Sequence, residues 1–151
     1  MTRRVLCDTN VLVSAVIAGG PPSRIIDASI DGHIELVLAD PVIDELERVL
    51  TLKLGFEPER VRNITALLID IAAVSIDAPT QPVEAITGDP DDDVVLACGI
   101  RAGVQIIVSG DRRHMLPIRE HRGIRIVSPQ ALLAELAGAT HQSPIARDVP
   151  L

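Results

Sequence analysis

The sequence predicts an α/β fold, a three-layer α/β/α sandwich built on a central, mostly parallel sheet. Short runs of apolar residues alternate along the chain with longer segments of helical periodicity, which is the pattern of a parallel sheet covered on both faces. The chain has 151 residues, of which 47% are hydrophobic and only 1% aromatic. One domain with an aliphatic core is therefore expected.

Five apolar runs have the length of strands rather than of helices. Polar or turn-forming residues bound each of them, and most are rich in Val and Ile. Because helical segments separate them, consecutive strands are expected to run parallel. In chain order the predicted strands are Arg3–Cys7, Ile34–Ala39, Val74–Ile76, Gln105–Val108 and Ile124–Val127.

Helices are predicted between these strands from their apolar faces and their ends. Asp40-Pro41 is a typical helix start, since aspartate caps free N–H groups and proline suits the first turn. From Asp93 onward the residues are apolar nearly all round, which predicts a helix in the middle of the fold, ended by Gly103. The predicted helices are Val11–Ala18, Ser23–Ile30, Pro41–Leu50, Phe56–Asp70, Asp93–Ala102 and Pro129–Ala137.

Two segments have no clear period. Residues 77–90 contain Pro, Thr and Gly and are predicted to form a surface loop of functional length. Residues 138–151 are expected to form a loosely ordered tail. The single domain is therefore expected to span residues 1–137.

Charge and composition exclude several ways of binding nucleic acid. The net charge of −7 argues against a protein that holds phosphates mainly through a cationic surface. The near absence of aromatic residues argues against modules that stack bases on exposed rings. If the substrate is a polyanion, divalent metal is the obvious means of offsetting the carboxylates.

Cysteine usage and hydropathy bear on the cellular compartment. Cys7 and Cys98 each lie inside an apolar run and are expected to be small core residues rather than ligands or redox groups. The chain has no signal-peptide pattern and no apolar stretch of the roughly 20 residues that span a bilayer. A soluble, cytoplasmic protein without a membrane role is expected.

Two acidic residues come directly after predicted strands. Asp8 follows Arg3–Cys7, and Asp111 follows Gln105–Val108. Alone, Asp8 is explained as a helix cap and Asp111 as a turn residue. In parallel sheets, however, sites form at the carboxyl ends of strands, and these two strands are expected to be neighbours. Carboxylates brought together there repel unless a cation separates them.

Residues 89–93 carry four aspartates immediately before the predicted buried helix. The helix dipole favours acidic residues at its N-terminus, which explains one or two of them but not four. Asp93 directly precedes the apolar stretch and is expected to point inward, whereas Asp91 is expected to stay solvated. Asp92 is a credible substitute for Asp93.

The helix after Pro41 offers two further carboxylates. Glu45 lies on one edge of its apolar stripe and Glu47 on the other, so helical geometry does not choose between them. Hard oxygen ligands of this kind suit Mg²⁺ or Mn²⁺. No nucleophile elbow, Walker A loop, zinc-protease helix or dinucleotide-binding fingerprint is present. The histidines lack ligand spacing and are expected at ordinary surface positions: His33, His114, His121 and His141.

In this order and spacing the acidic segments resemble the PIN-domain family, in particular small prokaryotic proteins that act as toxins of toxin-antitoxin systems. The resemblance covers about Val5 to Leu136. Its markers are Asp8-Thr9-Asn10 after the opening strand, Glu45-Leu46 in a helix, the block from Asp89 to Ala97, and Ile107-Val108-Ser109-Gly110-Asp111. It implies a PIN-like sandwich.

The resemblance also implies a function and a set of site residues. The implied activity is cleavage of single-stranded RNA by a metal-activated water, with Mg²⁺ or Mn²⁺ as cofactor. It selects Glu45 over Glu47. In related proteins with an Asp-Pro-Asp-Asp block, the equivalent of Asp93 can be Asn, so Asp92 and Asp93 both remain candidate ligands. The implied catalytic and metal-binding residues are Asp8, Glu45, Asp93 and Asp111, with Thr9, Asn10 and Ser109 orienting the carboxylates.

The expected partners are an RNA substrate, a small antitoxin protein and a second copy of the chain. Five arginines follow Asp111. They either lie in a solvated loop or contact RNA phosphates, and Arg112 and Arg113 are the first candidates for such contacts. Another metal-dependent nuclease, a phosphatase, or a scaffold that binds without cleaving are the alternative functions.

Overall fold

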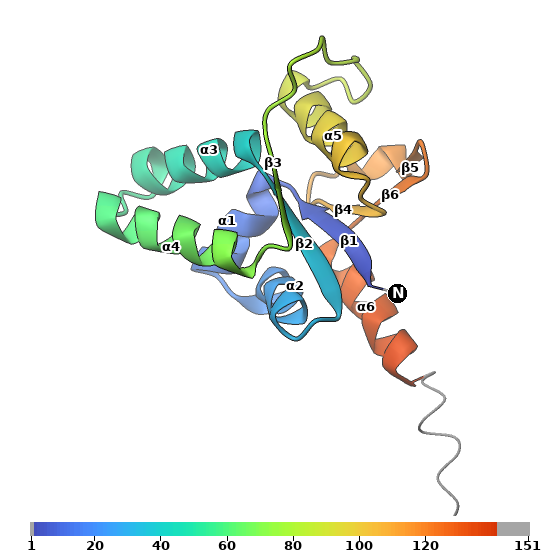
Figure 1. The fold of residues 1–151 in the computed structure, drawn as a ribbon, viewed down its shortest axis with the longest axis horizontal. Helices are drawn as coiled ribbons and strands as arrows, with labels where there is room; N and C mark the ends of the chain where they lie inside the picture. Colours follow the sequence, from blue (N-terminus) through green and yellow to red (C-terminus); the bar gives the residue numbers. More distant parts are fainter. Residues whose placement is uncertain (1, 142–151) are drawn as a thin grey trace, which may run out of the picture.

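The computed structural model describes residues 2–141 (Figure 1). In that part of the chain six strands form one sheet with the order β3-β2-β1-β4-β6-β5. Every pairing is parallel except that of β5 with β6, which is antiparallel. The strands are β1 Arg3–Cys7, β2 Ile34–Ala39, β3 Val74–Ile76, β4 Ile106–Val108, β5 Glu120–His121 and β6 Ile124–Val127.

Helices cover the two faces of this sheet, which confirms the predicted α/β sandwich. α2 packs on β2 and against α1 and α6, whereas α5 packs on β2 and β3 and against α3. In Figure 1, α5 lies on one side of the strands, and α2 and α6 lie on the other. The helices are α1 Thr9–Ile17, α2 Gly20–Ile30, α3 Asp40–Arg48, α4 Pro58–Ile71, α5 Pro90–Ala102 and α6 Pro129–His141, with a π-helical turn η1 at Val49–Lys53 and a 3₁₀ turn η2 at Leu116–Ile118.

The strand order reverses between β1 and β4. From β1 the chain proceeds outward through β2 and β3, and it then returns to β4 on the opposite side of β1. Such a reversal leaves a crevice at the carboxyl ends of the two strands, where open α/β sheets bind their ligands. Cys7 pairs with Val108, and the N–H of Asp8 donates to the Val108 carbonyl at 3.0 Å. The residues that follow β1 and β4 are therefore held side by side.

The core is aliphatic, as the composition predicts. Leu6, Leu36 and Ile107 are fully buried, and they lie on the three central strands. Cys7 and Cys98 are both buried and free. Burial raises the pKa of both thiols above their usual value, with Asp8 adding to the effect at Cys7. Both cysteines are therefore inert core residues, in agreement with the sequence prediction.

Helix starts are where the structure differs most from the predicted elements. α2 begins at Gly20 and includes two prolines that were expected in a loop, and α5 begins at Pro90, three residues before the predicted start at Asp93. Proline fits the first turn because its missing N–H is not needed there. Asp40 does not cap α3: the cap is Ala39, and Asp40 is the first helical residue.

Smaller differences concern the end of the chain and one strand. α6 continues to His141 rather than ending near Ala137, and residues 142–151 of the expected tail lie outside the described residues. β5 was not predicted, because two residues carry no recognisable period. Within residues 2–141 no single helix is long and apolar enough to cross a membrane, and α1 with α2, bent by 97°, pass that test by length and composition only as a pair.

A substitution at Gly99 tests how closely α5 packs on the sheet. A Cβ at this position would lie 2.9 Å from Cδ1 of Ile107 and 3.2 Å from Cγ2 of Val104. Gly99→Ala gains about 1 kcal/mol of helix propensity but overpacks the core by about 1–3 kcal/mol, so we expect a net loss of unfolding free energy of about 1 kcal/mol in urea denaturation. Gly138→Ala in α6, where nothing lies within 4 Å, is the control and should not lower stability. Equal stabilisation by both would contradict this packing.

Candidate functional site

A cavity of about 360 Å³ opens at the carboxyl end of the sheet, at the crevice between β1 and β4. The residues that follow β1 and β4 line it, together with residues at the start of α1, α3 and α5. Its lining is strongly acidic, because six carboxylates face one small space without a lysine or arginine among the lining residues. The acidic members are Asp8, Glu45, Asp89, Asp91, Asp92 and Asp111, and Thr9, Asn10, Pro41, Val42, Val94 and Val95 complete the lining.

Asp8 is the most buried of these carboxylates, with 4% of the residue exposed. It caps α1, since its Oδ1 accepts the N–H of Val11 at 3.1 Å, and it lines the cavity as well. Burial raises the pKa of Asp8, and the charge of Asp111 raises it further, against the lowering effect of its hydrogen bonds with Ser109 and Val11. A carboxylate held this way is a costly neighbour for further negative charge.

Ser109 links the two strand ends. Its hydroxyl donates to Oδ2 of Asp8 and accepts the N–H of Asp111 at 3.0 Å. The residue is fully buried, so this relay is fixed by its surroundings. Ser109 thereby holds Asp8 in place, as expected from the sequence. Among residues 2–141, the side chains of Thr9 and Asn10 line the cavity without hydrogen-bonding a carboxylate.

Asp111 lies at the turn that follows β4. Its Oδ1 accepts the N–H groups of Arg113 at 2.8 Å and His114 at 3.1 Å. Partial burial opposes ionisation of Asp111, but these bonds, a hydrogen bond with Asp92 and the nearby His114 together lower its pKa. The other oxygen, Oδ2, faces the cavity toward His114.

The pKa of Asp92 shows how strongly the carboxylates of the cavity repel one another. Burial, a hydrogen bond shared with Asp111, and the charges of Asp111, Asp89 and Asp8 raise its pKa to about 7. A carboxyl group that keeps its proton to neutral pH does so because a further negative charge is not tolerated beside the others. The structure thus places Asp92, the substitute in the sequence prediction, in the cavity.

Asp93 does not line the cavity, although the sequence made it the first choice. Its Oδ1 accepts the N–H groups of Thr87 at 2.7 Å and Ile86 at 3.0 Å. Burial opposes its ionisation, but these donors lower its pKa below the usual value. Asp93 therefore ties the preceding loop to α5. The reason is the earlier helix start: Asp89 is the cap and Pro90 the first residue, so it is Asp92 that faces the site.

Glu45 lies across the cavity, and Glu47 is not among its lining residues. Arg48, one turn further along α3, forms an ion pair with Glu45 at the rim. Side-chain exposure is 35% for Glu45, so this carboxylate is partly open to solvent. The geometry agrees with the choice of Glu45 that the resemblance made.

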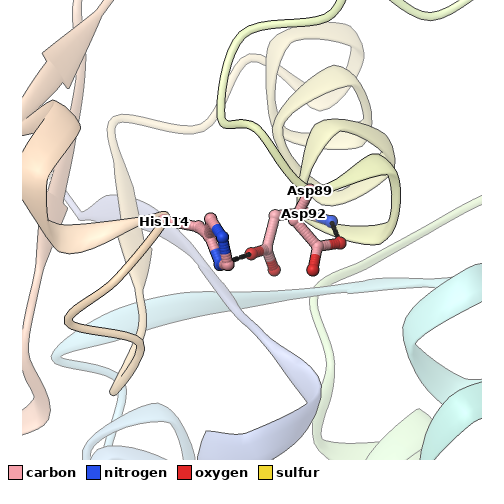
Figure 2. Close-up of side chains that lie close together, drawn as sticks. All are labelled: Asp89, Asp92 and His114. Atoms are coloured by element: carbon pink, nitrogen blue, oxygen red, sulfur yellow. Dashed lines mark hydrogen bonds and ion pairs between the residues drawn. The ribbon is translucent and has the colours of Figure 1, made fainter.

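His114 and Asp89 are the residues that sequence reasoning missed. His114 was expected at an ordinary surface position, but its Nδ1 lies 3.5 Å from Asp111 Oδ2 and 3.9 Å from Asp92 Oδ2. Figure 2 shows the ring pointing toward Asp92, with Asp89 beside it. Candidate ligand atoms of Asp89, Asp92 and His114 all lie within 4.8 Å of one another. The Asp-x-x-His spacing after β4 was the available signal.

The arginines after Asp111 divide into two groups. Arg122 pairs with Glu84 at 3.0 Å and Arg125 with Glu135 at 2.6 Å, so these two have structural partners. Arg112, Arg113 and Arg119 are exposed and form no ion pair within residues 2–141. Arg112 lines a second cavity of about 330 Å³, which shares Asn10 with the acidic cavity.

The donor set fits a small divalent cation. Several carboxylate oxygens converge from three parts of the fold, and Mg²⁺ and Mn²⁺ prefer ligands of this kind. The raised pKa of Asp92 is the second sign, since it measures repulsion that a cation would relieve. Asp8, Asp92, Asp111 and Glu45 are the residues placed to hold the ion or its waters.

Comparisons with known proteins identify the family and the fold. The PIN domain family model matches residues 4–113. Among solved structures, VapBC2 from Rickettsia felis bound to a DNA fragment from the promoter is similar with a TM-score of 0.58 and 9% identity, covering 82% of this chain and 96% of that one. PAE2754 from Pyrobaculum aerophilum also reaches 0.58, with 14% identity over 91% of this chain and 90% of that one. No curated protein matches the sequence.

The pKa of Asp92 predicts how stability depends on pH. An unfolded chain releases this proton near the ordinary value of 3.8, whereas the folded chain keeps it to about pH 7. Between these values the folded state binds more protons, so the free energy of unfolding falls as pH rises, by on the order of 2 kcal/mol after allowance for solvent screening. In EDTA, we expect a lower Tm at pH 7.5 than at pH 5.

Variants separate this effect from general charge effects. Asp92→Asn should flatten the decline of Tm between pH 5 and 7.5, while Asp70→Asn on the exposed side of α4 should leave it unchanged. The lowered pKa values of Asp93 and Asp111 affect only the region below about pH 4, outside the window. An Asp92→Asn profile identical to wild type would contradict the assigned strain.

Proposed function

The chain belongs to the PIN domain family, and on that premise we propose that it is a metal-dependent endoribonuclease that cleaves single-stranded RNA. The observation that carries the proposal is the convergence of Asp8, Asp92 and Asp111 at the β1–β4 crevice, with Glu45 opposite. Hydrolysis of a phosphodiester needs a site that binds a metal ion and a water molecule and that tolerates the negative charge of the phosphate. A cluster of carboxylates around one cavity supplies it when a cation is present.

Each residue has a proposed part. A bound Mg²⁺ or Mn²⁺ ion supplies a Lewis acid that lowers the pKa of water and offsets charge on the phosphate. Asp8 and Asp111 hold the ion, and Ser109 fixes the distance between them. Asp92 takes the place that the sequence first gave to Asp93, and Glu45 orients water from the opposite wall. Thr9 and Asn10 line the approach rather than orient ligands.

A polymer fits the surroundings of this site better than a small phosphate ester does. The second cavity, lined by Arg112, Ser128 and Gln130 among others, adjoins the acidic one at Asn10. A strand that crosses Asn10 could place one phosphate at the carboxylates and the next beside Arg112 or Arg113. This favours a nuclease over a phosphatase.

We extend the proposal to the biological partners. The similarity to VapBC2, which is described as bound to a DNA fragment from its own promoter, supports a toxin that is paired with a small antitoxin. The family resemblance adds a homodimer and a cytoplasmic site of action. Light scattering of the purified chain alone and with the product of a neighbouring small reading frame tests both partners.

A cleavage assay tests the activity. With labelled single-stranded RNA, we expect cleavage in Mg²⁺ or Mn²⁺ and none in EDTA. Asp8→Asn and Asp92→Asn should each lower the rate by about 100-fold or more, because each removes a carboxylate that holds the ion. Asp93→Asn should lower the Tm clearly and the cleavage rate only slightly, since Asp93 binds the loop at Thr87 and not the ion.

The controls define what would overturn the proposal. Asp70→Asn, far along α4, should cleave like wild type. Cleavage in EDTA, or full activity in both Asp8→Asn and Asp92→Asn, would exclude the site. Cleavage of single-stranded DNA but not RNA, or hydrolysis of a phosphate monoester alone, would replace the ribonuclease with one of the alternative enzymes. Metal binding without any cleavage across a panel of RNAs would favour the scaffold.

Ser109 offers a test of positioning. Ser109→Ala removes the hydroxyl between Asp8 and the Asp111 N–H, and we expect a loss of metal affinity of about 10- to 100-fold in calorimetric titration. Ser109→Thr retains the hydroxyl and should bind within about threefold of wild type if the added methyl fits. Unchanged affinity in Ser109→Ala would show that the relay does not position the carboxylates.

A further inference from the structure

His114 stands at the acidic cavity because of the turn that follows β4. Asp111 Oδ1 accepts the N–H groups of both Arg113 and His114, which turns the chain back toward the site. On its other side the ring lies against the loop before α5, where its Cδ2 is 3.7 Å from the place of a Cβ on Gly88. The imidazole is thus held between two loops, with 28% of its side chain exposed. Contacts with both loops therefore hold the ring in place beside the cavity.

The distances around Nδ1 leave room for an ion between the ring and the two carboxylates. Nδ1 lies 3.5 Å from Asp111 Oδ2 and 3.9 Å from Asp92 Oδ2 (Figure 2). Both separations exceed the 2.7–3.2 Å of a hydrogen bond from a ring nitrogen. Ligand atoms about 2.1 Å from one octahedral ion are about 3.0 Å apart when adjacent and about 4.2 Å apart when opposite. The observed distances lie between these two values, so the ring and the two carboxylates would adjust by about half an ångström when an ion binds.

The ring nitrogens also have no competing partner. Within residues 2–141 neither nitrogen of His114 makes a hydrogen bond, and its contacts with charged groups are those to Asp92 and Asp111. A ring that served only as a surface cation would be expected to close on one carboxylate, as Arg125 does on Glu135 at 2.6 Å. His114 instead faces two carboxylates at a similar distance from each.

We propose that His114 coordinates the divalent ion through Nδ1 and thereby makes the site prefer Mn²⁺ to Mg²⁺. The inference rests on the proposed function, since it concerns the ion of that same site. Mg²⁺ takes oxygen ligands and gains little from an imidazole. Transition ions bind nitrogen ligands more strongly than Mg²⁺ does, and among them Mn²⁺ is the ion whose usual ligands are carboxylate, carbonyl and water oxygens. One imidazole among the carboxylates of Asp92 and Asp111 therefore shifts the balance toward Mn²⁺.

Pulsed electron paramagnetic resonance of the Mn²⁺-loaded full chain provides a readout that does not depend on activity. Wild-type protein should show modulation of the electron spin echo by a directly coordinated ¹⁴N. His114→Asn should lose it, and His33→Asn, at an exposed position away from the cavity, should keep it. The backbone N–H that Asp111 accepts is present in both variants. A wild-type spectrum without nitrogen coupling would overturn the inference even if a variant failed to fold.

Titration calorimetry gives the second arm. His114→Asn should weaken Mn²⁺ binding by about 10- to 100-fold and Mg²⁺ binding by less than about threefold. Equal loss for both ions, or no loss for either, would exclude the proposed selectivity. Asp92→Asn separates the two levels of argument, because it should weaken both ions. If Asp92→Asn binds both ions like wild type, the metal site itself is wrong. If only His114→Asn leaves the affinity for both ions unchanged, the proposed metal site is retained and the proposed role of His114 is wrong.

Discussion

The structure depends on one constraint: the parallel pairing of β1 with β4 brings carboxylates together that would otherwise repel. Asp8 follows one strand and Asp111 the other, and the register Cys7 to Val108 fixes their separation. The fold lowers the electrostatic cost where it can, since Ser109 donates to Asp8 and backbone N–H groups donate to Asp111. Hydrogen bonds to the charged form favour ionisation, whereas burial and like charges oppose it. The repulsion that these hydrogen bonds do not offset raises the pKa of Asp92, whose carboxyl group is hydrogen-bonded to Asp111.

Helix α5 decides which aspartate takes up this position. Successive residues of an α-helix are about 100° apart around its axis, so the side chains of Asp92 and Asp93 point in different directions. Asp89 caps the helix and Pro90 begins it, which directs Asp92 into the cavity and Asp93 toward the loop N–H groups. The two carboxylates are thus adjacent in sequence but opposite in pKa, one raised to about 7 and the other lowered. A site residue and a structural residue were separated by helical geometry alone.

The sequence predicted most of the fold and about half of the site, for reasons that particular residues make clear. Apolar runs located five of the strands, and Asp8 and Asp111 followed because a strand end is visible in a sequence. The Asp-Pro signal at residues 40–41 predicted a helix start, but the same signal at Asp89-Pro90 fell in the segment 77–90, which has no clear period and was predicted as a loop. Asp92 was therefore ranked second. His114 was not predicted because its position depends on a side-chain-to-backbone turn at Asp111, which has no periodicity to detect.

The same crowding couples folding to ion binding. In the absence of a cation, the cluster stores repulsion that the hydrogen bonds of Ser109 and of the backbone only partly offset, so the folded state holds part of its strain at the β1–β4 crevice. An ion that binds the folded chain and not the unfolded one stabilises it in proportion to its concentration over its dissociation constant. Affinity and stability therefore draw on the same carboxylates. Relief of the strain by replacing Asp92 would stabilise the ion-free chain and weaken its hold on the ion, which is the opposition expected where a protein keeps like charges together for binding.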